Sequence, residues 1–281
     1  MSRTPPAASF RARLLARDHL VGTFIKTPTT HAIEILGAVG FDFMVIDAEH
    51  APFDRAAIDV CLLAARAAGT AGLVRVGDVS QVLSALDCGA SGVLVPHVTS
   101  AEATRQALAA ALYRGGRRGY SGSPRAAQYG AGGMWDSIDT GDAATTVIAM
   151  IEDPEGVSEI DSIVAFEALD AVFIGRGDLT VALGAASSSD AVVRDAVGRV
   201  IGAARRVGKP VCVMVGGASE AEAFRRQGAT AFIVSSDQGF MRRAGAQALA
   251  SIAGLASVQA EPLPPEAGAE GVALPEGHVH V

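Results

Sequence analysis

Charged and histidine side chains follow several short apolar runs of this 281-residue sequence, at the point where each run ends. The run Phe43–Ile46 is followed by Asp47, Glu49 and His50. The residues that follow later runs in the same way are Arg75, His97, Glu152, Asp153, Arg176 and Asp178. One charged group at such a position is ordinary. Carboxylates, a histidine and an arginine that converge on one edge of a fold indicate a site that does chemistry.

The two acids with the clearest chemical meaning are Glu152 and Asp178, which follow successive apolar runs. If those runs are neighbouring strands, the two carboxylates approach each other and need a proton or a cation between them. An all-oxygen pair with open positions suits Mg²⁺ or Mn²⁺, completed by water and substrate oxygens. In the structural alternative, Asp178 caps a turn over Leu179–Leu183 and Glu152 pairs with an arginine. We favour the metal because the two acids occur together.

His50 and Arg75 are the candidates for proton transfer and charge stabilisation. Imidazole is the side chain best matched to proton transfer near neutral pH, although His50 could also be a hydrogen-bonded loop residue. Arg75 ends an apolar run and is a buried unpaired charge unless an anion lies above it. A substrate carboxylate or a developing enolate oxygen supplies that anion. A salt bridge to Asp47 or Glu49 is the alternative, and for His97 both kinds of role stay open.

These residues need a scaffold, and the apolar runs predict one. Eight β-type runs recur along the chain, most of them followed promptly by a helical pattern. About 235 residues with eight such units match a TIM barrel, the (β/α)8 fold of the α/β class. A doubly wound sheet is the rival, but it needs a glycine-rich phosphate loop after its first strand, where this chain has Lys26-Thr27-Pro28. We expect an N-terminal lead-in over residues 1–19, the barrel over 20–256 and a flexible tail over 257–281.

One segment interrupts the alternation, and the composition limits the partners. Arg114–Gly133 is rich in Gly, Arg and Ser, and a barrel loop of this length is usually functional or a lid. A net charge of -7 argues against a nucleic-acid partner. No run approaches a membrane span, and the N-terminus has no apolar signal region, so we expect a cytoplasmic protein. The cysteines lack paired spacing and indicate buried thiols: Cys61, Cys88 and Cys212.

Four stretches resemble the HpcH/HpaI aldolase family, the class II, metal-dependent pyruvate aldolases that cleave 4-hydroxy-2-oxoheptanedioate and 2-keto-3-deoxy sugar acids. The stretches are Gly40–Asp54 (GFDFMVIDAEHAPFD), Leu73–Val98 (with LVRV and LDCGASGVLVPHV), Arg117–Gly130 and Ile151–Gly184 (with IEDPEGVSEID and LDAVFIGRGDLTVALG). The similarity spans about Leu20 to Leu255. The D-x-E-H-x-P and G-x-x-D-L-[ST]-x-x-L-G patterns are specific in combination, although the second also occurs in citrate lyase relatives.

The resemblance implies a barrel of the phosphoenolpyruvate/pyruvate-binding type, with aldol cleavage or condensation of a 4-hydroxy-2-oxo acid. The products are pyruvate, or a related 2-oxo acid, and an aldehyde. By the same resemblance His50 is the general base, Arg75 stabilises the enolate, and Glu152 and Asp178 bind Mg²⁺, Mn²⁺ or Co²⁺. Asp87 raises the basicity of the histidine across a subunit boundary. The implied assembly is a homohexamer, a trimer of dimers that exchange the last barrel helix.

Two departures from the family pattern concern the substrate. Met150 stands where many members have Gln, which helps to hold the oxo-acid end, and Arg176-Gly177 replaces Pro-Ala or Pro-Ser before Asp178. We expect Arg176, Gly177 and Asp178 to contact the substrate, with Arg176 able to bind an extra carboxylate. Three alternatives remain open. They are a synthase-type condensation or oxaloacetate decarboxylation on the same enolate, an imine mechanism through Lys26, and a non-catalytic binding barrel.

Overall fold

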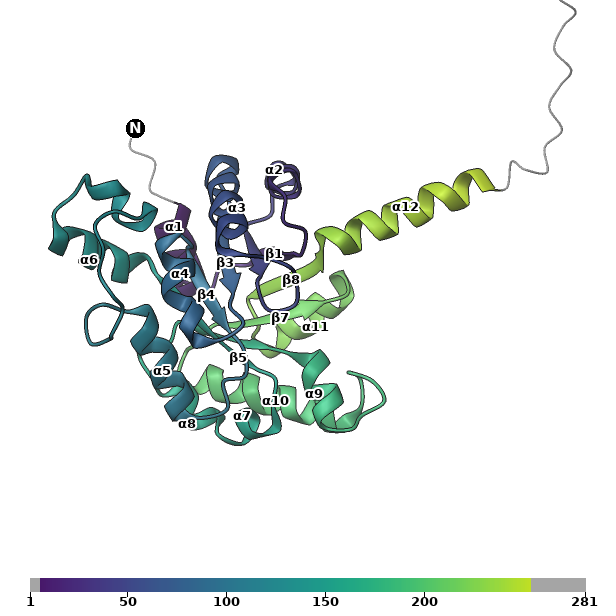
Figure 1. Ribbon diagram of the computed structural model, residues 1–281. Coiled ribbons are helices and arrows are strands. Elements are labelled where there is room, and N and C mark those ends of the chain that lie inside the picture. Colours follow the sequence, from purple (N-terminus) through teal and green to yellow (C-terminus); the bar gives the residue numbers. More distant parts are fainter. Residues whose placement is uncertain (1–5, 254–281) are drawn as a thin grey trace, which may run out of the picture. The chain divides into compact units, whose positions relative to one another are not determined.

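Eight parallel strands pair in chain order and close into a barrel, with β8 beside β1 (Figure 1). The computed structural model describes residues 6–253. The strands are β1 (Leu20–Ile25), β2 (Phe43–Asp47), β3 (Ala71–Arg75), β4 (Gly92–Val95), β5 (Thr146–Ile151), β6 (Ala171–Ile174), β7 (Val211–Val215) and β8 (Ala231–Ser236). The predicted (β/α)8 barrel is confirmed.

Helices alternate with the strands, and those from α2 up to residue 241 lie around the outside of the barrel (Figure 1). The helices are α1 (Pro6–Leu15), α2 (Thr30–Val39), α3 (Arg55–Ala68), α4 (Val82–Asp87), α5 (Ala101–Ala111), α6 (Met134–Ala144), α7 (Pro154–Ser158), α8 (Ile160–Val164), α9 (Arg176–Ala182), α10 (Ala191–Arg206), α11 (Ala218–Gln227) and α12 (Asp237–Ala253). Two 3₁₀ helices, η1 (Val79–Gln81) and η2 (Arg125–Gly130), complete the order. Side-chain caps fix several starts; Asp54, for example, accepts the N–H of Ala57 at the start of α3.

The chain divides into two compact units, Met1–Met241 and Arg242–Val281. The first unit holds all eight strands, and the described part of the second is the remainder of α12. The N-terminal lead-in contains α1, which the sequence analysis did not predict; its Phe10 and Leu14 are buried in the barrel interior. The tail expected over residues 257–281 lies outside the described residues, and the predicted domain bounds stay a prediction.

Two further expectations can be compared with residues 6–253. All three cysteines are buried and free, as predicted. Within these residues no helix is long and apolar enough to cross a membrane.

Strand alternation aims polar side chains into the barrel at its carboxyl end. On β2, Phe43 and Val45 are buried in the interior cluster, and the next residue with the same orientation is Asp47. Arg75 and Glu152 hold the corresponding positions at the ends of β3 and β5. Because side chains alternate along a strand with a period of two residues, these three charged side chains lie at one end of the barrel interior.

The segment predicted as a functional loop or lid, Arg114–Gly133, contains η2 and ends where α6 begins. Together with α6 it connects α5 to β5, so it meets the barrel at the amino end of β5. Chemistry in such barrels uses the strand-to-helix loops at the opposite, carboxyl end. The segment therefore does not form a lid over the carboxyl end of its own barrel.

Candidate active site

Asp47 and Arg75 form a buried ion pair at the carboxyl ends of β2 and β3. The two residues face each other in the strand register, which places their side chains next to one another. Arg75 donates from Nε to Oδ1 of Asp47 at 2.9 Å and from Nη2 to Oδ2 at 2.7 Å. This paired geometry is the strongest that an arginine makes with a carboxylate. The structure thus contains the salt bridge that the sequence analysis left open as an alternative.

Asp47 has two further partners besides Arg75. Lys26, at the end of β1, places Nζ 2.8 Å from Oδ2, and the backbone N–H of His50 donates to Oδ1 at 3.1 Å. Burial by itself raises the pKa of Asp47, but the hydrogen bonds and charges of Arg75 and Lys26 outweigh it and lower that pKa to about 2. Asp47 is therefore a carboxylate that holds three neighbouring groups in place at neutral pH.

Glu49 lies between the arginine and two histidines. Its Oε2 is 3.3 Å from Nη1 of Arg75 and 3.6 Å from Nε2 of His50, and its Oε1 is 3.7 Å from Nε2 of His97. The Oε2 atom is buried without a hydrogen-bond partner among the described residues. The side chain of His50 is 55% exposed although its backbone is held by Asp47. An exposed ring on a fixed backbone suits a group that exchanges protons with substrate.

His97 connects this group to the acids of β5. Its backbone N–H donates to Oε1 of Glu152 at 3.0 Å, and its Nδ1 lies 3.0 Å from Oδ2 of Asp153. Burial lowers the pKa of His97, but the three acids Asp153, Glu152 and Glu49 outweigh it and raise that pKa. The φ of 51° at His97 is left-handed, a conformation that non-glycine residues rarely adopt and that is often found at functional sites.

Glu152 and Asp178 form the carboxylate pair that the sequence predicted. Glu152 is 2% exposed, and Asp178 lies in the first turn of α9. Burial, reinforced by the carboxylate of Asp178 and opposed by His97, raises the pKa of Glu152 to about 7. A Cβ at Gly175 would lie 2.6 Å from both Cβ and Oε2 of Glu152, so the glycine makes room for this carboxylate.

The donor set fits a hard divalent cation. The buried carboxylate of Glu152 interacts with the exposed carboxylate of Asp178, and a cation between them removes their repulsion. In residues 6–253 no group of three or more His, Cys, Asp or Glu is arranged to hold a metal. Glu152 and Asp178 would therefore supply two oxygen ligands and leave the other positions to water and substrate.

Arg176 is bound away from this pair. Its Nη1 donates to Oε1 of Glu220 at 2.6 Å, its Nη2 donates to the carbonyl of Met214 at 2.8 Å, and its guanidinium lies over the ring of Phe224. A role in binding an extra carboxylate stays a prediction; Nη1 and Nη2 are already occupied, and Nε lacks a hydrogen-bond partner among the described residues. A Cβ built on Gly177 meets nothing within 4 Å, so the space beside it is open, as a substrate contact requires.

Two members of this site were not predicted from the sequence. Lys26 was expected only as a candidate for an imine, although its position directly after the first apolar run already places it at the same edge as Asp47. Gly175 had no expected role, and its only signal is a glycine between a β-type run and a charged turn. Asp87, at the end of α4, pairs with Arg118 at 3.4 Å within the described chain. Its expected role across a subunit boundary stays a prediction.

The comparison with known proteins settles the family. A sequence model of the HpcH/HpaI aldolase/citrate lyase family matches residues 20–244. The chain belongs to this family. It is 33% identical over 239 residues to a 5-keto-4-deoxy-D-glucarate aldolase from Klebsiella pneumoniae, covering 84% of this chain and 93% of that protein.

Solved structures agree with this assignment. A HpcH/HpaI aldolase/citrate lyase family protein from Burkholderia cenocepacia matches with a TM-score of 0.83 and 30% identity, over 88% of this chain and 99% of that one. The citrate synthase SbnG matches with a TM-score of 0.81 and 30% identity, over 89% and 99%. The resemblance predicted from motifs is confirmed, and the protein is a carbon–carbon lyase.

Proposed function

We propose that the enzyme catalyses the metal-dependent aldol cleavage, and the reverse condensation, of a 4-hydroxy-2-oxo acid. The products of cleavage are pyruvate, or a related 2-oxo acid, and an aldehyde. The observation that carries the proposal is the interaction of the buried Glu152 carboxylate with the exposed Asp178 carboxylate, at the same end of the barrel as Arg75 and His50. A cation at the pair, a fixed guanidinium and an exposed imidazole are the groups that enolate chemistry requires.

The name of the Klebsiella relative supports this substrate class. Numbered from its keto end, 5-keto-4-deoxy-D-glucarate is a 2-oxo acid with a methylene at carbon 3 and a hydroxyl at carbon 4. Cleavage between carbons 3 and 4 releases pyruvate and a three-carbon aldehyde acid. We infer a substrate with the same 2-oxo, 4-hydroxy arrangement for the present enzyme, and leave its remaining carbons open because Met150 and Arg176 depart from the family pattern.

A divalent cation bound by Glu152 and Asp178 would act as a Lewis acid toward the oxygens of the 2-oxo acid. His50 removes the proton from the 4-hydroxyl group, the bond between carbons 3 and 4 breaks, and its electron pair moves toward the keto group. Arg75 stabilises the negative charge that develops on that oxygen. Protonation of carbon 3 then gives pyruvate, and condensation follows the same steps in reverse.

The position of Lys26 argues against the imine alternative. An imine forms when a lysine amine attacks the keto carbon, which needs an unprotonated, unshared electron pair on Nζ. Here Nζ forms an ion pair with Asp47 at 2.8 Å. We assign Lys26 to the charge balance of Asp47, beside Arg75.

Removal of the metal tests the proposal. EDTA is expected to abolish pyruvate formation from a 4-hydroxy-2-oxo acid, and Mg²⁺, Mn²⁺ or Co²⁺ to restore it. The variant Asp178→Asn, which removes one ligand charge but keeps the side-chain volume, is expected to need a higher metal concentration. Full activity after exhaustive chelation, with inactivation by borohydride in the presence of pyruvate, would overturn the metal mechanism in favour of Lys26.

A synthase-type reaction is the second candidate, and two observations favour it. The citrate synthase SbnG is 30% identical over most of both chains, and the buried Met150 stands where aldolases of the family often carry Gln. Consumption of oxaloacetate in the absence of any aldehyde would identify condensation or decarboxylation on the same enolate. Pyruvate release that occurs only from hydroxy-oxo acids would exclude it.

The assembly and the location remain proposals as well. We propose a homohexamer, a trimer of dimers, on the support of the family resemblance, and a cytoplasmic location on the support of the sequence patterns described above. The mass of the purified protein from light scattering tests the hexamer, and a mass of one or two chains would overturn it.

A further inference from the structure

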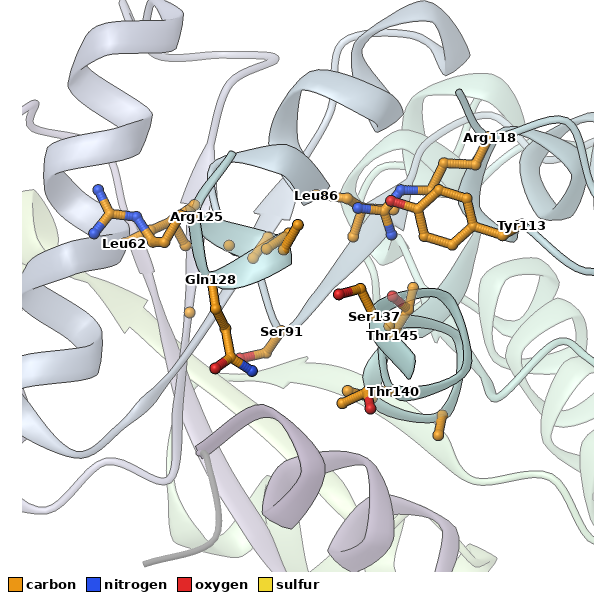
Figure 2. Close-up of a pocket in the computed structure, with 18 of the residues that line it drawn as sticks. Leu62, Leu86, Ser91, Tyr113, Arg118, Arg125, Gln128, Ser137, Thr140 and Thr145 are labelled. Carbon is orange, nitrogen blue, oxygen red and sulfur yellow. The ribbon is translucent and has the colours of Figure 1, made fainter. Parts of the chain in front are cut away.

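A cavity of about 660 Å³ lies at the amino ends of β3, β4 and β5, opposite the end that carries the candidate active site (Figure 2). Its wall includes Thr70, Ser91 and Thr145, which directly precede these three strands. The other side of the wall comes from α3, α4, η2 and α6. Sites for small molecules in proteins commonly have this size. The Gly/Arg/Ser-rich segment after α5, for which the proposed reaction has no use, thus encloses a separate space.

A buried guanidinium with unused donors lines this cavity. The side chain of Arg118 is 2% exposed, and its Nε has no hydrogen-bond partner among the described residues. Its Nη2 reaches Oδ1 of Asp87 at 3.4 Å, which is longer than a usual charged hydrogen bond. The guanidinium also lies over the ring of Tyr113, 4.4 Å from its centroid. Because a buried charge with unmet donors is costly, an oxyanion in the cavity would be stabilised by Arg118.

The charges of the wall favour an anion. The charged residues that line the cavity are Arg66, Arg118, Arg125 and Asp139. Asp139 forms an ion pair with Arg114, which does not line the cavity, and Arg125 pairs in the same way with Asp59 at 2.8 Å. Arg66 has no ion pair within residues 6–253. Arg118 has only the long 3.4 Å contact with Asp87, so the positive charge left on the wall comes from Arg66 and, in part, from Arg118.

The rest of the wall has room and contacts for a carbon skeleton. Leu62 and Leu86 supply apolar surface, and the rings of Tyr113 and Tyr120 lie edge to face at 6.2 Å. Figure 2 shows Arg118 and Tyr113 at one side of the cavity and Ser91 toward the other. We propose that the cavity binds a small organic carboxylate, with its charged end on Arg118 and its carbon skeleton against the tyrosine and leucine side chains. This site lies at the end of the barrel opposite the candidate active site of the same chain.

Equilibrium dialysis of radiolabelled benzoate against the purified full-length enzyme tests the proposal. We expect saturable binding of one benzoate per chain and at least about tenfold weaker binding in Arg118→Gln, since a hydrogen bond to a charged group contributes about 1.5–3 kcal/mol. Arg117→Gln is the matched control, because it removes the same charge from an exposed neighbour that does not line the cavity. Its binding is expected to equal that of the unchanged enzyme.

Arg118→Gln could disturb the fold, so a second pair of variants replaces an exposed residue that lines the cavity. Thr140 lines the cavity from α6 and is exposed, so both Glu and Gln fit there without strain. Thr140→Glu is expected to weaken benzoate binding through charge repulsion, whereas the uncharged Thr140→Gln is not.

Three outcomes would overturn the proposal. The first is benzoate binding that survives both Arg118→Gln and Thr140→Glu. The second is binding that Asp178→Asn abolishes, which would place the benzoate in the candidate active site instead. The third is that inorganic phosphate displaces the labelled benzoate as strongly as unlabelled benzoate does, which would show an oxyanion site without a role for the carbon skeleton. Loss of aldol activity alone has no bearing on any of these measurements.

Discussion

Replacement of Arg75 by methionine, alone and together with Asp47→Asn, separates a structural role of this arginine from a catalytic one. Methionine keeps much of the length of the side chain and removes its charge. In the single variant Asp47, which is fully buried, loses the two hydrogen bonds from Nε and Nη2. It keeps Lys26 at 2.8 Å and the backbone N–H of His50. The carboxylate of Asp47 therefore loses part of its stabilisation in this variant but still has two partners.

The size of the effect follows from this geometry. Loss of one partner of a buried ion pair costs about 3–5 kcal/mol, and the remaining contact with Lys26 keeps the cost at the lower end. The pKa of Asp47, lowered to about 2, shows that Arg75 and the other partners together outweigh the burial that raises it. We expect Arg75→Met to lower the free energy of unfolding by about 2–3 kcal/mol. For a chain of this size the melting temperature then falls by roughly 5–10 °C.

The double variant Asp47→Asn/Arg75→Met removes the stranded charge and is expected to regain most of this stability. Catalysis is followed by NMR as the exchange of the methyl protons of pyruvate with solvent, which needs the enolate but no aldehyde. If Arg75 stabilises the enolate, exchange falls by about 10²–10³-fold in both variants, the usual loss for one oxyanion donor. The matched control is Arg206→Met, which breaks an exposed pair with Asp161 and should cost less than about 1 kcal/mol.

Two results would refute this reasoning. If the double variant recovers both the melting temperature and the exchange rate, Arg75 only neutralises Asp47 and has no role at the enolate. If exchange is normal while aldol cleavage is impaired, Arg75 contacts the aldehyde part of the substrate instead.

Three other predictions can be checked separately. His50→Ala should lower kcat by about 10²–10⁴-fold with fold and metal affinity intact, and a loss below about threefold would remove it as the base. Gly175→Ala should weaken Mn²⁺ binding at least about tenfold by calorimetry, because its Cβ would lie 2.6 Å from Oε2 of Glu152; Gly198→Ala, with nothing within 4 Å, is the control and should not change it. The lowered pKa of Asp47 means that its stabilising charge is complete above about pH 4 and is lost as the pH falls toward 2. Asp47→Asn should therefore flatten acid unfolding over this range, and an unchanged acid profile would contradict the assignment.

Several features of this protein were determined by the sequence alone. The alternation of apolar runs and helical patterns predicted the barrel, because each βα unit is encoded by residues close together in the chain. The period of two within a strand is equally local, so the positions of Asp47, Arg75 and Glu152 at strand ends already indicated a common edge. The positions of Glu152 and Asp178 just after the ends of successive strands predicted their approach for the same reason.

Other features were decided only by the tertiary structure. The register between β2 and β3 sets Arg75 against Asp47, and the ends of β1 and β2 bring in Lys26. The pairing of Arg176 with Glu220 joins residues that are 44 positions apart. The segment after α5 encloses a cavity at the amino ends of the strands, where a pattern of glycine and arginine alone suggested a lid. Local pattern fixes which way a side chain points along its own strand, whereas its partner depends on strand register and barrel closure, which involve the whole chain.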